Sequence, residues 1–426
     1  MILTRHQLDT HNEQQLAAHQ KRYAYLSETL PHAEAVVQQL VDFQIAIPSW
    51  ALGTGGTRFG RFPGGGEPTS LEQKIEDVGL LHALNQSSGA ISLHIPWDIP
   101  ADSAAINDLA SRFGLTFDAV NSNTFQDQLG QTKSYKFGSL QNVDAGVRRQ
   151  AIAHNIECIK YGQALGSKAL TVWLADGSCF PGQQNFRKAF NRTLDSLGEI
   201  YNALPPDSGT APWRMFVEYK PYEPNFYSMA FGDWGASYLY CSKLGKQADC
   251  LVDFGHHLPN ANIEQIVALL MNERKLGGFH FNDSKYGDDD LPVGSMKPYQ
   301  LFLVFNELVE GMALDPARKL AWMIDASHNV KDPLEDLLQS VEAIKLAYAQ
   351  ALCLDRATLA DAQEVSDVVR AQELLQDAFR TDVRPLVAEA RLRAGAALNP
   401  IGLYRQVHAR QQLIRERGLL TRATGL

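Results

Sequence analysis

The stretch Cys250-Leu-Val-Asp-Phe-Gly-His-His257 is an apolar, β-rich run that ends on a carboxylate and two imidazoles. A short apolar run of this kind is typical of a buried strand of a parallel sheet. Counting this run there are eight of them, at 44–50, 90–97, 117–123, 168–176, 214–220, 250–257, 277–283 and 321–327. Stretches with helical periodicity lie between successive runs, among them 72–85, 145–165, 186–201, 263–273 and 299–310. Strand followed by helix, eight times, predicts an α/β fold, a (β/α)8 barrel.

The chain divides by composition into three parts. Residues 1–42 are polar with Leu and Ala at helical intervals, which predicts N-terminal helices ahead of the barrel. Residues 43–332 make up the predicted (β/α)8 catalytic barrel, and residues 333–426 are rich in the helix formers Ala, Leu, Arg, Gln and Glu. We expect this last part to be a C-terminal helical extension with contacts in an oligomer, although the sequence leaves open whether it stabilises the barrel instead.

The overall composition excludes several classes of protein. The chain has 426 residues, of which 45% are hydrophobic and 20% charged, as in globular proteins, and its net charge of -9 offers no basic surface for nucleic acid. No apolar stretch approaches the ~18 to 20 residues of a membrane span, and the N-terminus lacks the apolar run of a signal peptide. The five cysteines are scattered, which argues against disulfides and zinc knuckles. We therefore expect a cytoplasmic protein with reduced thiols and neither nucleic-acid nor membrane partners.

Four consecutive predicted strands end on residues that are common metal ligands. The active site of a (β/α)8 barrel lies at the carboxyl ends of its strands, where residues two apart face the same side. A carboxylate in an apolar strand costs several kcal/mol unless it is paired or bound to a cation. One such residue alone is explained as well by an ion pair or a core hydrogen bond. Four at equivalent positions indicate a divalent metal site, and they are Glu218, Asp253, His280 and Asp325.

A second set of ligand-type residues follows in the loops. Oxygen ligands with one or two imidazoles suit Mn, Mg, Co or Zn. The run 283–290 holds four aspartates, and although such a run is usually a solvated turn, its position directly after His280 and Asn282 indicates further ligands. Strict alternation from Asp253 predicts that His257, rather than His256, points inward. Because alternation fails where loops begin, we expect one of these two histidines to bind metal and the other to pack or hydrogen bond.

Polar and aromatic residues complete the wall of the predicted cavity. Lys220 lies two residues after Glu218 and would face the same space, where it could hold a polarised oxygen or an anionic intermediate, or pair with the acidic cluster. Flat rings beside hydrogen-bonding groups suit a sugar or polyol. The groups concerned are Trp50, His94, Asn121, Asn123 and Trp173.

The glycine-rich segment 53–66 lacks the spacing of nucleotide-binding loops, so it is interpreted as a lid over the catalytic face. The chain also has neither a G-x-S-x-G elbow nor an H-E-x-x-H helix, so serine-nucleophile and zincin chemistry are unsupported.

Several long strings resemble one known family. They are Ile47-Pro-Ser-Trp50, Gly53-Thr-Gly-Gly-Thr-Arg-Phe59, Ser92-Leu-His-Ile-Pro-Trp-Asp98, Asn121-Ser-Asn-Thr-Phe125, Ser167-Lys-Ala-Leu-Thr-Val-Trp173 and Gly278-Phe-His-Phe-Asn-Asp-Ser-Lys-Tyr-Gly-Asp-Asp-Asp290. From about residue 40 to the C-terminal helices, the chain resembles the bacterial L-rhamnose isomerases of the broad-specificity Pseudomonas type. The segment 208–213, with Tyr219 and Pro221, departs from that pattern.

The resemblance implies a xylose-isomerase-like TIM barrel with two divalent metal ions per subunit, usually Mn or Co, with Zn and Mg as further candidates. It also implies a homotetramer whose subunits complete one another's sites. Carried onto this sequence, the ligands of a structural metal are Glu218, Asp253, His280 and Asp325, and those of a catalytic metal are His256, Asp288 and Asp290. The substrate-binding residues are Trp50, His94, Trp173, Lys220, Phe125 and Phe59, the last as a wall of the neighbouring subunit's pocket. The catalytic residues are Glu218, Lys220 and Asp325.

The activity expected from this resemblance is interconversion of aldoses and ketoses. The substrates would be L-rhamnose and L-rhamnulose, with D-allose and D-psicose as further sugars, and the reaction a metal-mediated hydride shift. An enediol-type isomerase or epimerase is an open alternative. So are a two-metal hydrolase on the same barrel, although Ser49-Trp50 stands where such hydrolases carry H-x-H, and a sugar-binding protein without catalysis.

Overall fold

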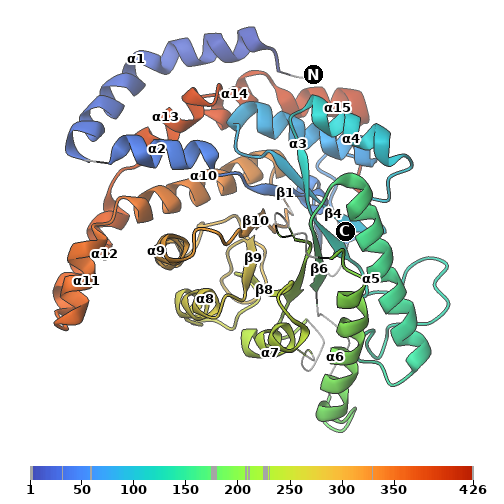
Figure 1. Ribbon diagram of the computed structural model, residues 1–426. Coiled ribbons are helices and arrows are strands. Elements are labelled where there is room, and N and C mark those ends of the chain that lie inside the picture. The colour runs from blue at the N-terminus through green and yellow to red at the C-terminus, as the bar shows by residue number, and fades with distance from the viewer. Residues whose placement is uncertain are drawn as a thin grey trace.

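Eight parallel strands close into a barrel (Figure 1), as the sequence predicts. The computed structural model describes residues 3–30, 32–57, 60–173, 180–206, 209, 212–223, 229, 231–328 and 330–424. Each strand pairs with the next along the chain, and the last returns to the first. The strands are β1 (Ala46–Pro48), β4 (Ala90–Ile95), β5 (Thr116–Ser122), β6 (Ala169–Trp173), β7 (Arg214–Glu218), β8 (Ala248–Asp253), β9 (Leu276–Phe281) and β10 (Ala321–Ile324).

The strands end earlier than the apolar runs do. After β1 the chain enters a 3-10 turn, η1 (Ser49–Leu52). Trp50 therefore lies in that turn, whereas the sequence predicted it in a strand. Pro48 has no backbone N–H to extend the ladder, and the Ser49 hydroxyl donates to Asp98 Oδ2 at 2.5 Å. The apolar runs of the sequence therefore extend beyond the hydrogen-bonded strands into the loops that follow them.

Eight helices cover the outside of the barrel. Seven of them begin at a capping residue whose side chain accepts a hydrogen bond from the first turn, while α9 begins at Pro298. The eighth, α10, packs against α9 and α3 and so closes the ring, beginning where the sequence places the C-terminal extension. The helices are α3 (Leu71–Asn85), α4 (Ser103–Arg112), α5 (Ala145–Leu165), α6 (Phe186–Asn202), α7 (Trp234–Leu244), α8 (Ile263–Asn272), α9 (Pro298–Leu314) and α10 (Pro333–Leu352).

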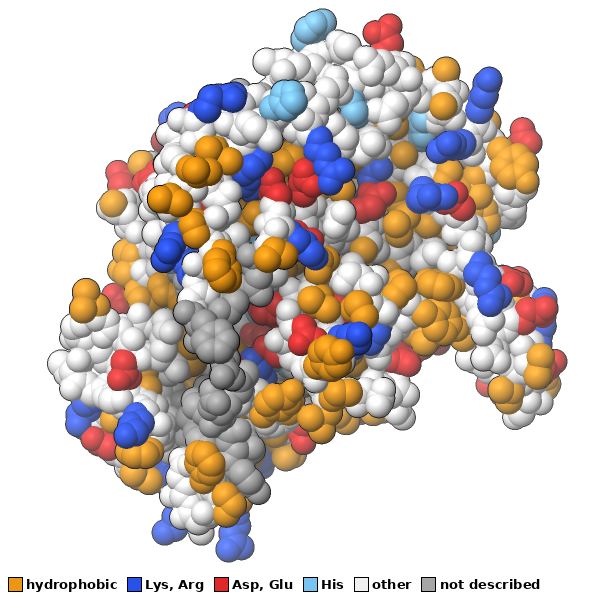
Figure 2. Space-filling view, turned by 180° about the vertical axis from the view of Figure 1, so that it is seen from behind, with side chains coloured by type: hydrophobic (Ala, Val, Ile, Leu, Met, Phe, Trp, Pro, Cys, Tyr) orange, Lys and Arg blue, Asp and Glu red, His pale blue; other side chains and the backbone are white. Residues whose placement is uncertain are grey.

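Further helices lie against one side of the ring (Figure 1). The N-terminal helices α1 (Arg5–Thr29) and α2 (Ala33–Asp42) both pack on α13 (Arg384–Arg393). A hairpin of α11 (Arg356–Glu364) and α12 (Val368–Arg380) projects from the body (Figures 1 and 2). The chain continues through α14 (Pro400–Gln406) and α15 (Ala409–Arg417). Across the described residues, no helix combines the length and apolarity that a membrane span needs.

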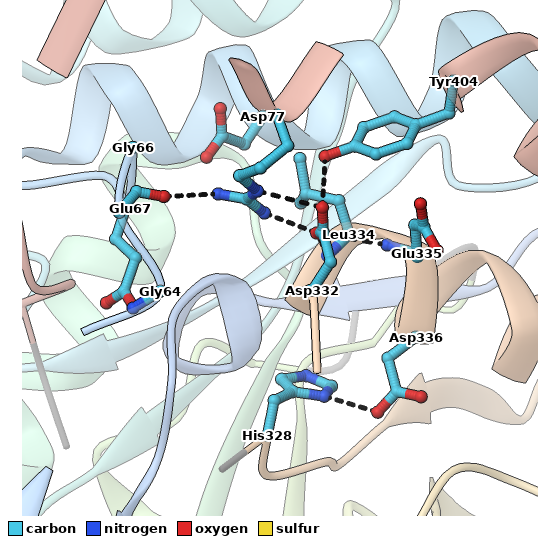
Figure 3. A network of polar contacts seen from close by, with 12 residues as sticks. Gly64, Gly66, Glu67, Asp77, His328, Asp332, Leu334, Glu335, Asp336 and Tyr404 are labelled. Atoms are coloured by element: carbon cyan, nitrogen blue, oxygen red, sulfur yellow. Dashed lines mark hydrogen bonds and ion pairs between the residues drawn. The ribbon is translucent and has the colours of Figure 1, made fainter. Parts of the chain in front are cut away.

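The C-terminal helices are tied to the loop that follows the first strand. Within that loop β2 (Gly56–Thr57) and β3 (Gly60–Arg61) form a two-stranded antiparallel sheet. The Arg410 guanidinium donates to both carboxylate oxygens of Asp332, at 3.0 and 2.6 Å, and to the Gly65 carbonyl at 3.1 Å. The Tyr404 hydroxyl donates to the same aspartate at 2.8 Å (Figure 3). The backbone N–H of Ala423 donates to Glu67 Oε2 at 2.8 Å. Segments more than 300 residues apart in the sequence thus form one polar network.

Candidate active site

A cavity of about 1010 Å³ opens at the carboxyl ends of the strands. Figure 2 shows acidic side chains recessed in a hollow between hydrophobic ones. Asp253 is fully buried beneath the cavity rather than lining it, and Phe59 lies outside the described residues. Asn123, predicted as part of the wall, does not line this cavity. All the other residues of the predicted site do, namely Trp50, His94, Asn121, Phe125, Trp173, Glu218, Lys220, His256, His280, Asp288, Asp290 and Asp325.

Four side chains from neighbouring strand ends form the first ligand group, which consists of Glu218, Asp253, His280 and Asp325. One possible ligand atom of each lies within 4.8 Å of those of the others. The parallel ladder explains the convergence, since Asp253 pairs with His280 in register and Asp325 N donates to Phe281 O at 2.9 Å just after β10 ends. His280 Nδ1 lies 3.1 Å from Glu218 Oε1 and 3.5 Å from Asp325 Oδ2.

The second ligand group consists of Asp253, His256 and Asp288, so Asp253 belongs to both groups. Its Oδ1 accepts hydrogen bonds from Gly255 N at 2.7 Å and from Asn282 Nδ2 at 3.0 Å. Its Oδ2 is buried and accepts no hydrogen bond from the described residues. One oxygen of Asp253 is thereby fixed by protein donors while the other remains available to a cation.

The turn after β8 decides which histidine faces the cavity. His256 N donates to Asp253 Oδ1 at 3.2 Å, so the backbone curls around the carboxylate and alternation stops at Asp253. His256 lines the cavity, whereas His257 Nε2 is hydrogen bonded to the Tyr219 hydroxyl at 2.7 Å. Strand parity therefore pointed to the wrong histidine, and the family resemblance pointed to the one that lies in the cavity.

The aspartates of the run 283–290 serve different purposes. Asp283 Oδ2 accepts from the Met296 and Lys297 amides, and Asp289 Oδ2 accepts from the Tyr286 amide at 2.8 Å, so these two shape the loop. Asp288 joins the second ligand group. Asp290 lines the cavity but lies outside both groups, with Asn282 Nδ2 at 3.4 Å from its Oδ1.

Gly255 allows Asp288 to approach the centre. A Cβ atom at Gly255 would lie 2.5 Å from Asp288 Oδ1 and 3.3 Å from Asp253 Oδ1, closer than van der Waals contact. The absence of a side chain at this position therefore lets the carboxylates of Asp253, at the end of β8, and of Asp288, in the loop after β9, share one small space.

The clustered carboxylates hold the imidazoles in their charged form. Burial by itself would lower the pKa of His280, but Glu218 and Asp325 raise it to about 10. Burial likewise opposes the charge on His256, yet Asp253 and Asp288 hold its pKa well above the usual range. Burial and the neighbouring carboxylates raise the pKa of Asp253 to about 7. The carboxylates of the centre therefore carry more negative charge than the two imidazolium groups and the nearby ammonium of Lys220 neutralise. This excess favours binding of a further cation.

The donor set fits divalent metal ions. Buried oxygens without a hydrogen-bond partner in the described part of the chain include Asp253 Oδ2, Asn282 Oδ1 and Asp288 Oδ1. Carboxylate oxygens with one imidazole per group are ligands that Mn, Co, Zn and Mg accept, and no described cysteine takes part in either group. A bound ion would replace the protons that the two histidines carry.

Lys220 approaches the second ligand group from the end of β7. Its ammonium forms ion pairs with Asp288 and with Glu223 and lies 5.0 Å from the centre of the Trp173 ring. Burial opposes its charge, but the two carboxylates raise the pKa of Lys220 above its usual value. The lysine therefore remains an ammonium donor. Sequence reasoning missed Glu223, because it lies beyond the strand where alternation gives no direction.

Aromatic rings form part of the cavity wall beside the ligand groups. The ring centroids of Phe125 and Trp173 are 4.7 Å apart, and those of Trp50 and His94 are 5.4 Å apart. The ring of Trp97, which sequence reasoning did not select, is tilted by 33° against that of His94, with the two centroids 4.2 Å apart. Flat apolar faces beside polar groups can pack against the C–H faces of a sugar.

Two hydrogen bonds link this wall to the first ligand group and to the strands of the barrel. The Trp50 indole N–H donates to Asp325 Oδ1 at 2.8 Å and thereby orients that carboxylate. Asn121, predicted as part of the wall, donates to the Leu93 carbonyl at 3.1 Å and so also ties β5 to β4.

A buried ion pair supports the segment that carries His94, which is part of the aromatic wall. Lys74 on α3 and Asp98 are both fully buried, with Lys74 Nζ 2.5 Å from Asp98 Oδ1. The other oxygen of Asp98 accepts from the Ser49 hydroxyl and, at 2.8 Å, from the backbone N–H of His94. Sequence reasoning missed this pair, because a lysine within a helical pattern carries no signal of burial.

The closed barrel and its clustered ligands define a class, the (β/α)8 barrel proteins with a candidate divalent-metal centre at the catalytic face. No family model matches the chain. Over 95% of its length it is 52% identical to a probable sugar isomerase of Mesorhizobium japonicum, covering 94% of that protein. It is 51% identical over 96% of its length to a probable sugar isomerase of Rhizobium meliloti, covering 95% of that protein.

Among solved structures, an L-ribulose 3-epimerase superposes with a TM-score of 0.54 at 13% identity, covering 76% of this chain and 98% of that one, which supports the fold. The chain belongs to the family of these probable sugar isomerases.

Proposed function

We propose that this protein is a metal-dependent aldose-ketose isomerase that interconverts L-rhamnose and L-rhamnulose and also accepts D-allose and D-psicose. The observation that carries the proposal is the pair of ligand groups sharing Asp253 at the floor of a cavity with an aromatic wall. Membership of the sugar isomerase family supports the reaction class. The choice of L-rhamnose rests on the resemblance in the sequence strings.

In this proposal the first ligand group holds one ion, and His256 and Asp288, with Asp290 nearby, hold the second. Mn is the proposed metal, and Co, Zn and Mg suit the same donors. Bound ions of this kind polarise sugar oxygens and orient neighbouring hydroxyls. We also propose a homotetramer, as the resemblance implies.

The chain's own residues bind the sugar and stabilise developing charge. Trp50, His94, Phe125 and Trp173 would contact the sugar and exclude water. Lys220 would donate to the oxygen that gains negative charge as hydrogen moves between adjacent carbons, where a fixed donor in a dry site is most effective. We propose that the hydrogen moves as a hydride. A proton transfer through an enediol, with a site carboxylate as base, is the competing route.

The test is ketose formation from a panel of aldoses, with chelator-treated protein and after restoring Mn, Co, Mg or Zn separately. We expect turnover of L-rhamnose to disappear on metal removal and to return with metal, most strongly with Mn. The same assay in deuterium oxide should give ketose with little deuterium at the transferred position. Full turnover without metal would exclude the two-ion assignment, and rapid incorporation of deuterium would favour the enediol.

Two other functions predict different results. In a separate assay with a panel of esters and amides, release of product would indicate a two-metal hydrolase. Saturable sugar binding with restored Mn but no ketose would indicate a binding protein.

Replacing Lys220 should separate metal binding from turnover. For Lys220→Ala we expect unchanged metal content and a fall in kcat of about 10² to 10³, the usual effect of losing one preorganised donor. Glu223→Gln should lower kcat less, because Asp288 still holds the ammonium. Lys285→Ala, which removes an exposed lysine from the loop before Asp288, is the matched control and should leave both quantities unchanged. Loss of metal in Lys220→Ala would show that the lysine supports the ligands instead.

A further inference from the structure

A second site lies where α2, α10 and α13 meet, side by side in Figure 1. Because α2 leads into β1 and the segment 85–87 leads into β4, this junction is at the amino-terminal end of the barrel, opposite the candidate active site. The three helices enclose a cavity of about 10 Å³, which is room for one water-sized occupant. Apolar residues make up more than half of the lining, and the others are Asn85, Gln86, Ser87, the acidic Glu342 and two cationic residues, Lys345 and Arg391.

Lys345 is buried and forms no ion pair with a described carboxylate. It is 4% exposed, its ammonium donates to the Leu40 carbonyl, and the ammonium lies 5.6 Å from the centre of the Phe43 ring. The other two fully buried lysines pair with carboxylates, Lys74 with Asp98 and Lys220 with Asp288. Lys275, which is half-buried, donates to three carbonyl oxygens at 2.6 to 3.0 Å. Among the three buried lysines that the structure describes, Lys345 is therefore the one whose acceptor is an uncharged carbonyl and not a carboxylate.

Arg391, which faces the same cavity, also keeps a free donor. Its guanidinium pairs with Glu342 and donates to the Leu398 carbonyl at 3.0 Å, while its buried Nε has no hydrogen-bond partner among the described residues. Glu342, which pairs with Arg391 and also attracts Lys345, is 32% exposed. Asp42, the other acid acting on Lys345, is exposed at the end of α2.

The energetics of this junction favour an added negative charge. Burial, and then the positive charge of Arg391, lower the pKa of Lys345 to about 7. A buried donor without an acceptor is destabilising, so an occupant that accepts from both side chains would satisfy Arg391 Nε and a further N–H of Lys345 together. A monatomic anion accepts from several donors and places a negative charge beside the two buried cations, whose nearby acids Glu342 and Asp42 are partly or fully exposed to solvent. A water molecule supplies no such charge.

We propose that this cavity binds a single halide-sized anion, chloride under ordinary conditions, which bridges Lys345 and Arg391 and ties α13 and α2 to the barrel helix α10. The site has no part in the proposed isomerisation. Its occupant acts on the stability of the fold, by binding the native state and not the unfolded chain.

Thermal unfolding at constant ionic strength tests the proposal, with sodium chloride or bromide replacing sodium gluconate in steps. We expect a saturable rise in Tm with halide for the natural protein and no such rise for Lys345→Met. The matched control is Lys275→Met, which removes an ammonium already satisfied by carbonyls. This control should have a lower Tm but the same dependence on halide.

Bromide-soaked crystals of the natural protein give an independent readout that needs no variant to fold. An anomalous peak in the cavity, together with the halide dependence of Tm, supports the site. A peak seen only at soaking concentrations with no effect on Tm, a water molecule in place of the ion, or equal halide dependence in Lys345→Met would each overturn the proposal.

Discussion

Asp253→Asn is expected to abolish both metal binding and isomerase activity. The residue belongs to both ligand groups, and its Oδ2 is the oxygen left without a protein donor. An amide would present a neutral oxygen or an N–H to each ion. If metal contributes ~4 kcal/mol to transition-state stabilisation, its loss lowers turnover about a thousandfold. Elemental analysis of the purified variant and the L-rhamnose assay measure the two effects.

The matched control for this variant is Asp249→Asn on the same strand. Asp249 is as deeply buried as Asp253, but it pairs with Arg214 at 2.7 Å and with Arg318 at 2.5 Å, away from the cavity. This change should reduce stability and leave metal content intact. If Asp253→Asn kept both metals and normal turnover, the assignment of the centre would be wrong.

Lys74→Met should produce the largest loss of stability among the single changes considered. Removing the lysine leaves the fully buried Asp98 without its cation, and breaking a buried ion pair from one side costs about 3 to 5 kcal/mol. Because Asp98 also accepts from the His94 amide, we expect the KM for sugar to rise in the fraction that stays folded. Urea unfolding measures the first effect and steady-state kinetics the second.

An exposed ion pair provides the comparison. Arg370 and Glu373 on α12 lie 2.6 Å apart with about half of each side chain exposed, so Arg370→Met should change the free energy of unfolding by less than ~1 kcal/mol. A similar loss of stability in both variants would mean that burial adds nothing to the Lys74 interaction.

The repeat of apolar runs was sufficient to predict the barrel, because parallel strands buried on both faces leave a recognisable pattern. The same pattern predicted that Glu218, His280 and Asp325 lie close together, since residues at the carboxyl ends of neighbouring parallel strands meet at one rim of the barrel. Loops follow no such rule. Trp50 lies in a turn where a strand was expected, and alternation selected His257 although His256 faces the cavity. The family resemblance resolved that choice because it carries information about loops that periodicity lacks.

By itself, then, the sequence determined the fold class and the rim on which the chemistry-bearing side chains gather, because both follow from local periodicity and from the geometry of a closed parallel sheet. Tertiary structure alone decided which members of each cluster share a space. Asp288 reaches the centre because Gly255 leaves room for it, while Asp289 is used to hold the loop. The ion pair of Lys74 with Asp98, and the position of Lys345 and Arg391 on one cavity, bring separate elements together by burial, which no spacing in the sequence records.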